Sequence, residues 1–255
     1  MARKDHTFIG GEHGSFESTQ WTQIFLAGGG EEGPRKKAVA RILGQYWKPV
    51  YCYLRRKGYD NEKAKDLTQG YFCDIVLGRK LLERADPRKG KFRTLLLTAL
   101  NNYAISVARR EQAGKRKPAE GLIALDGDDA PVPEPRDDVT PQEAFQCAWA
   151  AALVETVLEE VERGCLADGR QRHWRVFHAL VVQPILGEGA PVPLAELCET
   201  LGIDSTTKAY NMNVTVKRRF QAAMEARVRQ YTDSDAAVQE EIRDIMAALS
   251  RRPAG

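Results

Sequence analysis

The chain has 255 residues, of which 43% are hydrophobic and 29% are charged, and its formal net charge is +3. This length and composition suit one large folded domain or two small ones. No apolar run approaches the roughly 18 residues of a membrane span, and the N-terminus lacks the apolar core of a signal peptide. We therefore expect no membrane segment and a cytoplasmic location. Five scattered cysteines without a C-x-x-C pair argue against disulfides and a zinc site.

The charges are distributed unevenly along the chain. Residues 35–118 hold 22 Lys and Arg against 7 Asp and Glu, whereas residues 119–143 hold 1 basic residue against 8 acidic ones. A basic block of this size favours a polyanion-binding domain, and the short acidic block after it favours a linker.

The N-terminal extension, residues 1–34, carries one predicted helix. Residues 1–15 are expected to be disordered, 16–28 have the pattern of a short amphipathic helix, and 28–34 form a Gly-rich loop.

Two helices are expected next. The first covers 35–58, where Pro49 should kink or interrupt it and Gly58 should end it. The second covers roughly 61–84, with Asp60 as its N-cap.

The second of these helices contains an unusual polar cluster. Asp66, Thr68 and Gln69 stand beside Leu67 and Tyr71, which belong to the apolar stripe. A third strong helix, 92–116, ends in "RREQAGKRKP", which holds five positive charges in ten residues. Such density favours a phosphate-facing terminus, and a merely solvated basic end is the alternative.

The acidic, Pro-rich segment 119–141 cannot build a core and predicts a linker. Helices resume over 141–164 and 170–182. "PLAELCETLGID" and the helix that starts at Thr206 have the pattern of a helix-turn-helix, with Gly202 at the turn. A last helix, in the extension 233–255, should pack on this unit or recruit a partner, through apolar residues at Val238, Ile242, Ile245, Met246 and Leu249. The chain is predicted to be all-α.

The helix that follows the Gly202 turn presents a polar face. Thr207, Asn211 and Arg218 lie opposite its apolar stripe, with Lys208 and Thr215 on the flank. Asn and Lys near the start of such a helix suit base edges, and Arg218 suits phosphate. An ordinary solvated face is the alternative interpretation.

Together, "YLRRKGYDNEKAKDLTQGYFCDIV", "KGKFRTLLLTALNNYAISVARREQAGKR" and the helix-turn-helix resemble a bacterial sigma factor of the extracytoplasmic-function (ECF) type, in the sigma-70 family. The resemblance covers about 35–117 and 142–230. It implies two helical domains, sigma region 2 at 35–118 and sigma region 4 at 142–232, joined by the flexible linker 119–141.

The resemblance also implies what these segments bind. In the family, a "D-L-x-Q-x-x-F" segment docks on the beta-prime coiled coil of core RNA polymerase, and the beta flap is a second polymerase contact. Lys65, Asp66 and Gln69 would be the polar contacts, while Leu67 and Phe72 would pack inside the domain. This explains the polar cluster, for which an accidental polar patch is the alternative.

The family also reads promoter DNA at two elements. The −10 element would be contacted by Asn101, Asn102, Arg109, Arg110, Lys115 and Arg116. The −35 element would be contacted by Thr206, Thr207, Lys208, Asn211, Thr215 and Arg218. Leu95 stands where the family often has a Trp, so an aromatic wedge for melting DNA is in doubt here.

The expected function is that of a transcription initiation factor, with no chemistry, cofactor or metal of its own. A stand-alone helix-turn-helix regulator is the alternative, which would leave the "DLTQGYF" segment unexplained. An enzyme is disfavoured because no G-x-x-x-x-G-K-[ST] motif occurs and "DGDD" falls in the linker. A helical adaptor would leave the basic block unexplained. Control by an anti-sigma protein, or by another regulatory partner, is left open.

Overall fold

The computed structural model describes residues 20–29, 31–78, 81–115, 139–186, 192–232 and 234–250. Within these ranges the chain is helical and has no β-strand, so the all-α prediction is confirmed for them. None of the helices in the same ranges is long and apolar enough to cross a membrane. The predicted disordered start and most of the predicted linker lie outside the described residues.

Four α-helices, a π-helical turn and a short 3₁₀ helix form the first part of the described chain. The turn, η1, continues directly from the third helix without a loop. In chain order the elements are α1 (Gln20–Gly28), α2 (Glu32–Arg56), α3 (Asn61–Gly70), η1 (Tyr71–Leu77), the 3₁₀ helix η2 (Pro87–Lys89) and α4 (Phe92–Lys115).

The second part begins with the longest helix. Its N-terminus has a capping box, in which Thr140 and Glu143 satisfy each other's backbone N–H groups, and Pro141 lies in the first turn. The elements are α5 (Pro141–Ala167), α6 (Gln171–Phe177), the π-helical turn η3 (His178–Val182), α7 (Gln183–Leu186), α8 (Leu194–Leu201), α9 (Thr206–Arg229) and α10 (Asp235–Ser250).

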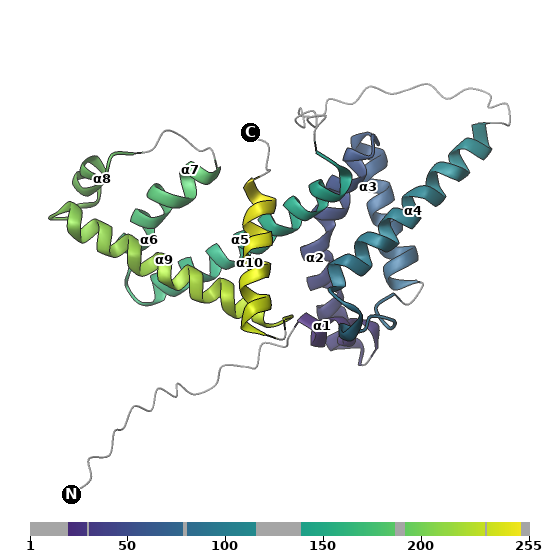
Figure 1. Cartoon of the computed structure of the whole chain (residues 1–255), viewed down its shortest axis with the longest axis horizontal. Coiled ribbons are helices and arrows are strands. Elements are labelled where there is room, and N and C mark those ends of the chain that lie inside the picture. Colours follow the sequence, from purple (N-terminus) through teal and green to yellow (C-terminus); the bar gives the residue numbers. More distant parts are fainter. Residues whose placement is uncertain are drawn as a thin grey trace, which may run out of the picture.

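Helix α5 joins the two parts. It packs against α2, α9 and α10. Helices α3 and α4 lie at one end of the molecule, and α8 with the start of α9 lies at the other (Figure 1). Tyr46 of α2 stacks on Phe145 of α5 with ring centroids 6.5 Å apart. One hydrophobic core therefore runs continuously from α1 to α10.

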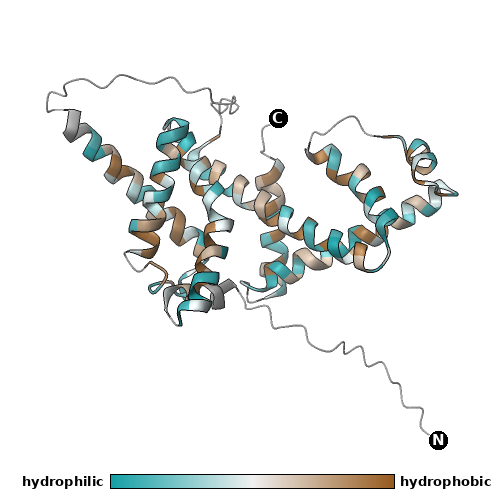
Figure 2. Ribbon diagram, turned by 180° about the vertical axis from the view of Figure 1, so that it is seen from behind, coloured by the Kyte–Doolittle hydropathy of each residue, from teal (hydrophilic) through white to brown (hydrophobic). Residues whose placement is uncertain are grey.

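The helices have the amphipathic pattern that such packing requires. Hydrophilic and hydrophobic residues alternate along each long helix (Figure 2). A smaller second core lies beneath the predicted helix-turn-helix, formed by buried Val176, Leu197, Cys198, Ile203, Ala209 and Met212. This unit thus has a hydrophobic centre of its own.

Three details differ from the sequence predictions. Pro49 does not interrupt its helix, because α2 continues through it and buried residues on both sides hold the helix against the core. The predicted helix 61–84 ends at Leu77 of η1, and Gly78 follows it. Met246, assigned to the apolar stripe of the last helix, is 53% exposed, while Val238 and Ile245 are buried.

Candidate nucleic-acid and partner interfaces

The polar cluster on α3 divides between surface and core. Lys65, Asp66 and Gln69 are all exposed and lie on one side of the helix. Thr68, by contrast, is fully buried and donates its hydroxyl to the carbonyl of Ala64 at 2.7 Å. We call Lys65, Asp66 and Gln69 the α3 polar surface, whereas Thr68 belongs to the core.

Two side chains fix where α3 begins. Asp60 caps the helix by accepting a hydrogen bond from the backbone N–H of Lys63 at 2.8 Å, as its position predicts. Tyr51 of α2 donates its hydroxyl to the Asn61 side chain at 2.7 Å. The α3 polar surface therefore stands on a helix whose N-terminus is held by its neighbour.

The π-helical turn η1 anchors the other end of α3. Phe72 is buried and stacks on Trp47 of α2, with ring centroids 5.9 Å apart. Tyr71 is fully buried and donates to the carbonyl of Leu96 in α4 at 2.7 Å. Rigid aromatic packing behind a polar surface is the arrangement that a protein interface needs.

Helix α4 presents part of the predicted −10 set on its exposed face. Asn102, Arg109 and Arg110 are exposed. Asn101 is half-buried, and its side-chain oxygen accepts a hydrogen bond from Tyr53 at 2.9 Å. Asn101 therefore ties α4 to α2, which sequence reasoning did not anticipate.

The side chains of the other two predicted −10 residues lie outside the described set. Lys115 is the last residue of α4, and its side chain lies outside the described set. Arg116 lies outside the described residues altogether. Their roles stay predictions.

A cavity of about 430 Å³ lies beside the exposed face of α4. Asn102 and Arg110 line it, together with Ser106 from the same helix and Asp74 and Arg84 from the η1 side. The side chains around this small concave site include both hydrogen-bond donors and acceptors, which suits the binding of an unstacked base. Ser106 follows Asn102 at helical spacing and was predictable from sequence, whereas no sequence signal pointed to Arg84.

An apolar side chain interrupts this polar face. Ile105 is 40% exposed on α4, and helical spacing puts it between Asn102 and Arg109. The sequence interpretation missed it because one apolar residue outside the stripe is common on soluble helices. Here it offers an apolar contact beside amide and guanidinium groups.

The helix-turn-helix has the predicted turn. Gly202 adopts a left-handed conformation with φ 61° and ψ 49°, which ends α8. Ile203 is buried beneath the turn. Ser205 then caps α9 by accepting a hydrogen bond from the backbone N–H of Lys208 at 3.2 Å. The Gly202 turn, the buried Ile203 and the Ser205 cap together fix the start of α9 relative to α8.

The start of α9 carries the predicted −35 set. Thr206, Thr207, Lys208, Asn211 and Arg218 are exposed, and Thr215 is half-buried. Four of the six, namely Thr207, Lys208, Asn211 and Thr215, line one shallow depression. Thr206 and Arg218 lie outside it, before and after these residues along the helix.

Two further residues border this face. Tyr210 is 59% exposed and offers a large amphipathic ring close to Thr207 and Asn211 along α9. His173 of α6 lines the depression. Burial lowers the pKa of His173, and the guanidinium groups of Arg170 and Arg219 lower it further. At neutral pH His173 is therefore an uncharged hydrogen-bonding group.

In the described ranges no three His, Cys, Asp or Glu side chains gather in a group that would hold a metal ion. The five cysteines are free thiols, and Cys165 and Cys198 are buried.

The chain matches no family model, and no curated protein or solved structure is significantly similar to it.

Proposed function

We propose that this chain is a sigma factor of the ECF type, which directs core RNA polymerase to specific promoters. One observation supports this most: a single helical chain combines the exposed α3 polar surface with a capped helix-turn-helix. A DNA-binding regulator has no need of the first feature, and an adaptor has no need of the second.

In this proposal the α3 polar surface binds the beta-prime coiled coil of the polymerase. Lys65, Asp66 and Gln69 make the polar contacts, and the buried Phe72 supports the helix from behind. Asp66 and Gln69 have no hydrogen bond or ion pair in the described part of the chain, so both are available to a partner. The beta flap is the second contact of the polymerase.

Two helices would read the promoter. On α4, Asn102, Arg109 and Arg110 contact the −10 element, and the cavity between α4 and η1 receives a base from the opened strand. On α9, Thr207 and Asn211 read base edges of the −35 element in the major groove, while Arg218 contacts phosphate. The protein contributes binding and DNA opening, and the polymerase carries out the chemistry.

The test combines polymerase binding with transcription. Purified chain is mixed with core polymerase, co-purified, and assayed by run-off transcription on a promoter library. The double variant Asp66→Ala/Gln69→Ala should lose most co-purification and transcription. The matched control is Gln239→Ala/Glu240→Ala, which removes the same chemical groups from exposed positions on α10 and should leave both readouts unchanged.

A stand-alone helix-turn-helix regulator is the second candidate. It is favoured by the separate core under α8 and α9, which would let this unit bind DNA by itself. If the chain binds a specific duplex but never co-purifies with core polymerase, the regulator is the better description and the sigma-factor proposal fails.

A further inference from the structure

A cavity of about 530 Å³ opens where the two parts of the molecule meet. Helices α2, α5 and α9 contribute its walls, and α1 and the start of α4 contribute single residues. Its volume falls in the range of small-molecule sites, roughly 300–1,000 Å³. Neither candidate DNA-reading face includes it, so the proposed function leaves it unexplained.

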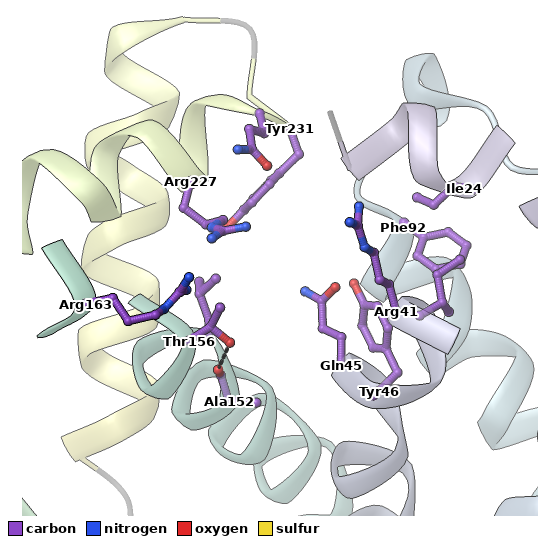
Figure 3. Close-up of a pocket in the computed structure, with 14 residues that line it drawn as sticks. Ile24, Arg41, Gln45, Tyr46, Phe92, Ala152, Thr156, Arg163, Arg227 and Tyr231 are labelled. Carbon is purple, nitrogen blue, oxygen red and sulfur yellow. Dashed lines mark hydrogen bonds between the residues drawn. The ribbon is translucent and has the colours of Figure 1, made fainter. Parts of the chain in front are cut away.

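Three arginines surround the opening of this cavity. Arg41 projects from α2 on one side, and Arg163 of α5 and Arg227 of α9 project from the other (Figure 3). No acidic residue is among the lining residues that the structure describes. The three guanidinium groups therefore face a shared space that has no carboxylate in its lining.

The arginines differ in how far they are already engaged. Arg227 pairs with Glu160 at 2.8 Å. Arg163 donates its Nε to the backbone carbonyl of Glu159 at 3.3 Å, which leaves its terminal nitrogens free for another acceptor. Arg41 is exposed and has no ion pair within the described ranges. Two of the three can thus bind an anion without breaking an ion pair.

The inner surface of the cavity is apolar and aromatic. Ile24, Ile42, Phe92 and Leu153 line it and are buried, and so is Tyr46, whose ring meets that of Phe92 edge-to-face at 5.7 Å. Gln45 and Gln230 add amide groups to the lining. A flat apolar body could pack against these rings while its hydrogen-bonding groups meet the amides.

We infer that this junction cavity binds a small ligand with an aromatic body and two or more negative charges, as a nucleoside triphosphate has. The arginine fork matches phosphate oxygens in geometry as well as charge. A ligand bound there contacts α2 on one side and α5 and α9 on the other, so it stabilises their packing by mass action. The inference does not depend on the proposed function, because its readout is binding by the free chain.

The test is calorimetric titration of the full chain with ATP and GTP, with pyrophosphate and adenosine as probes of the rim and the inner surface separately. ATP or GTP should bind more tightly than pyrophosphate alone or adenosine alone. Arg41→Gln and Arg163→Gln should each weaken its binding by about tenfold, the effect of losing one charged hydrogen bond. Both positions are exposed, and unchanged melting temperatures without ligand would show that the variants are folded.

The matched control is Arg243→Gln on α10, an exposed arginine without an ion pair in the described chain. It should leave triphosphate binding unchanged. The inference is overturned if neither triphosphate binds up to about 1 mM, or if all three variants weaken binding equally, which would mean general charge attraction. It is also overturned if the two cavity variants weaken promoter DNA binding but not triphosphate binding.

Discussion

Glu241 of α10 and Arg93 of α4 form an ion pair that is buried from solvent. The guanidinium group donates to both carboxylate oxygens, with Nη2 2.9 Å from Oε2, and Lys91 donates to the same carboxylate. Glu241 is fully buried, and Arg93 stacks over the ring of Trp149 in α5 at 4.2 Å. This one cluster therefore joins α4, α5 and α10.

Removing the carboxylate should destabilise the whole chain. Glu241→Ala leaves Arg93 buried without its partner, and breaking a buried pair in this way costs about 3–5 kcal/mol. Urea unfolding should show a loss of that size in the free energy of unfolding. The control Glu240→Ala, at the next and exposed position, should change it by less than about 0.5 kcal/mol. Equal effects of the two variants would mean that the cluster contributes nothing to stability.

The same pair should make stability depend on pH. Burial raises the pKa of Glu241, but hydrogen bonds and charge from Arg93 and Lys91 outweigh burial and hold this pKa below its ordinary value of 4.5. The unfolded chain then takes up the proton more readily than the folded chain, so acid favours unfolding. The stabilisation is present above about pH 4.5 and is lost as the pH falls further.

The measurement compares the wild type with Glu241→Gln, which keeps the shape of the side chain and removes its titratable carboxyl group. The stability difference between them should stay constant near neutral pH and shrink in acid, below the ordinary carboxyl pKa. A difference that grows as the pH falls would contradict the assigned direction of the pKa.

Local sequence signals account for the N-caps of several helices and for the turn of the helix-turn-helix. Asp60, Thr140 and Ser205 act as N-caps because their side chains accept backbone hydrogen bonds from residues that follow closely. Gly202 ends α8 because it adopts a left-handed backbone conformation, which glycine reaches without steric cost. Lys65 and Asp66, which the family resemblance assigns as polar contacts, are exposed.

Contacts between distant segments were beyond the sequence interpretation. Arg93 and Glu241 are 148 positions apart, and nothing in either local pattern distinguishes them from surface charges. The bond from Tyr53 to Asn101 likewise depends on how α2 meets α4. The π-helical turn that begins at Tyr71 has no periodic signature, because it adds only one residue to a helical turn.

Replacing Gly202 by Ala should weaken the helix-turn-helix. At φ 61° an added Cβ meets no neighbouring atom, so the cost comes from the left-handed backbone alone, about 1 kcal/mol. Gly164→Ala is the control, because Gly164 lies inside α5 with open space around it, where Ala should stabilise by about 0.5–1 kcal/mol. Thermal unfolding should therefore shift in opposite directions for the two variants. A shift in the same direction would contradict the conformational argument.

Base reading and phosphate contact on α9 should separate by mutation. Asn211→Ala should cost about 1–3 kcal/mol on the preferred duplex and relax the choice of base at one position, because an amide can pair with a base edge at two points. Arg218→Ala should weaken binding to all duplex sequences alike. It should also lower the slope of log affinity against log salt concentration by about 1.

Binding of a duplex library at several salt concentrations measures both effects, with Arg243→Ala on α10 as the charge-matched control. Since Asn211 and Arg218 are both exposed, neither substitution should disturb the core beneath α8 and α9. If Asn211→Ala left the sequence preference intact while Arg218→Ala altered it, the two roles would have to be exchanged. If the control variant lowered the salt slope as much as Arg218→Ala, α9 would not be the helix that meets the phosphates.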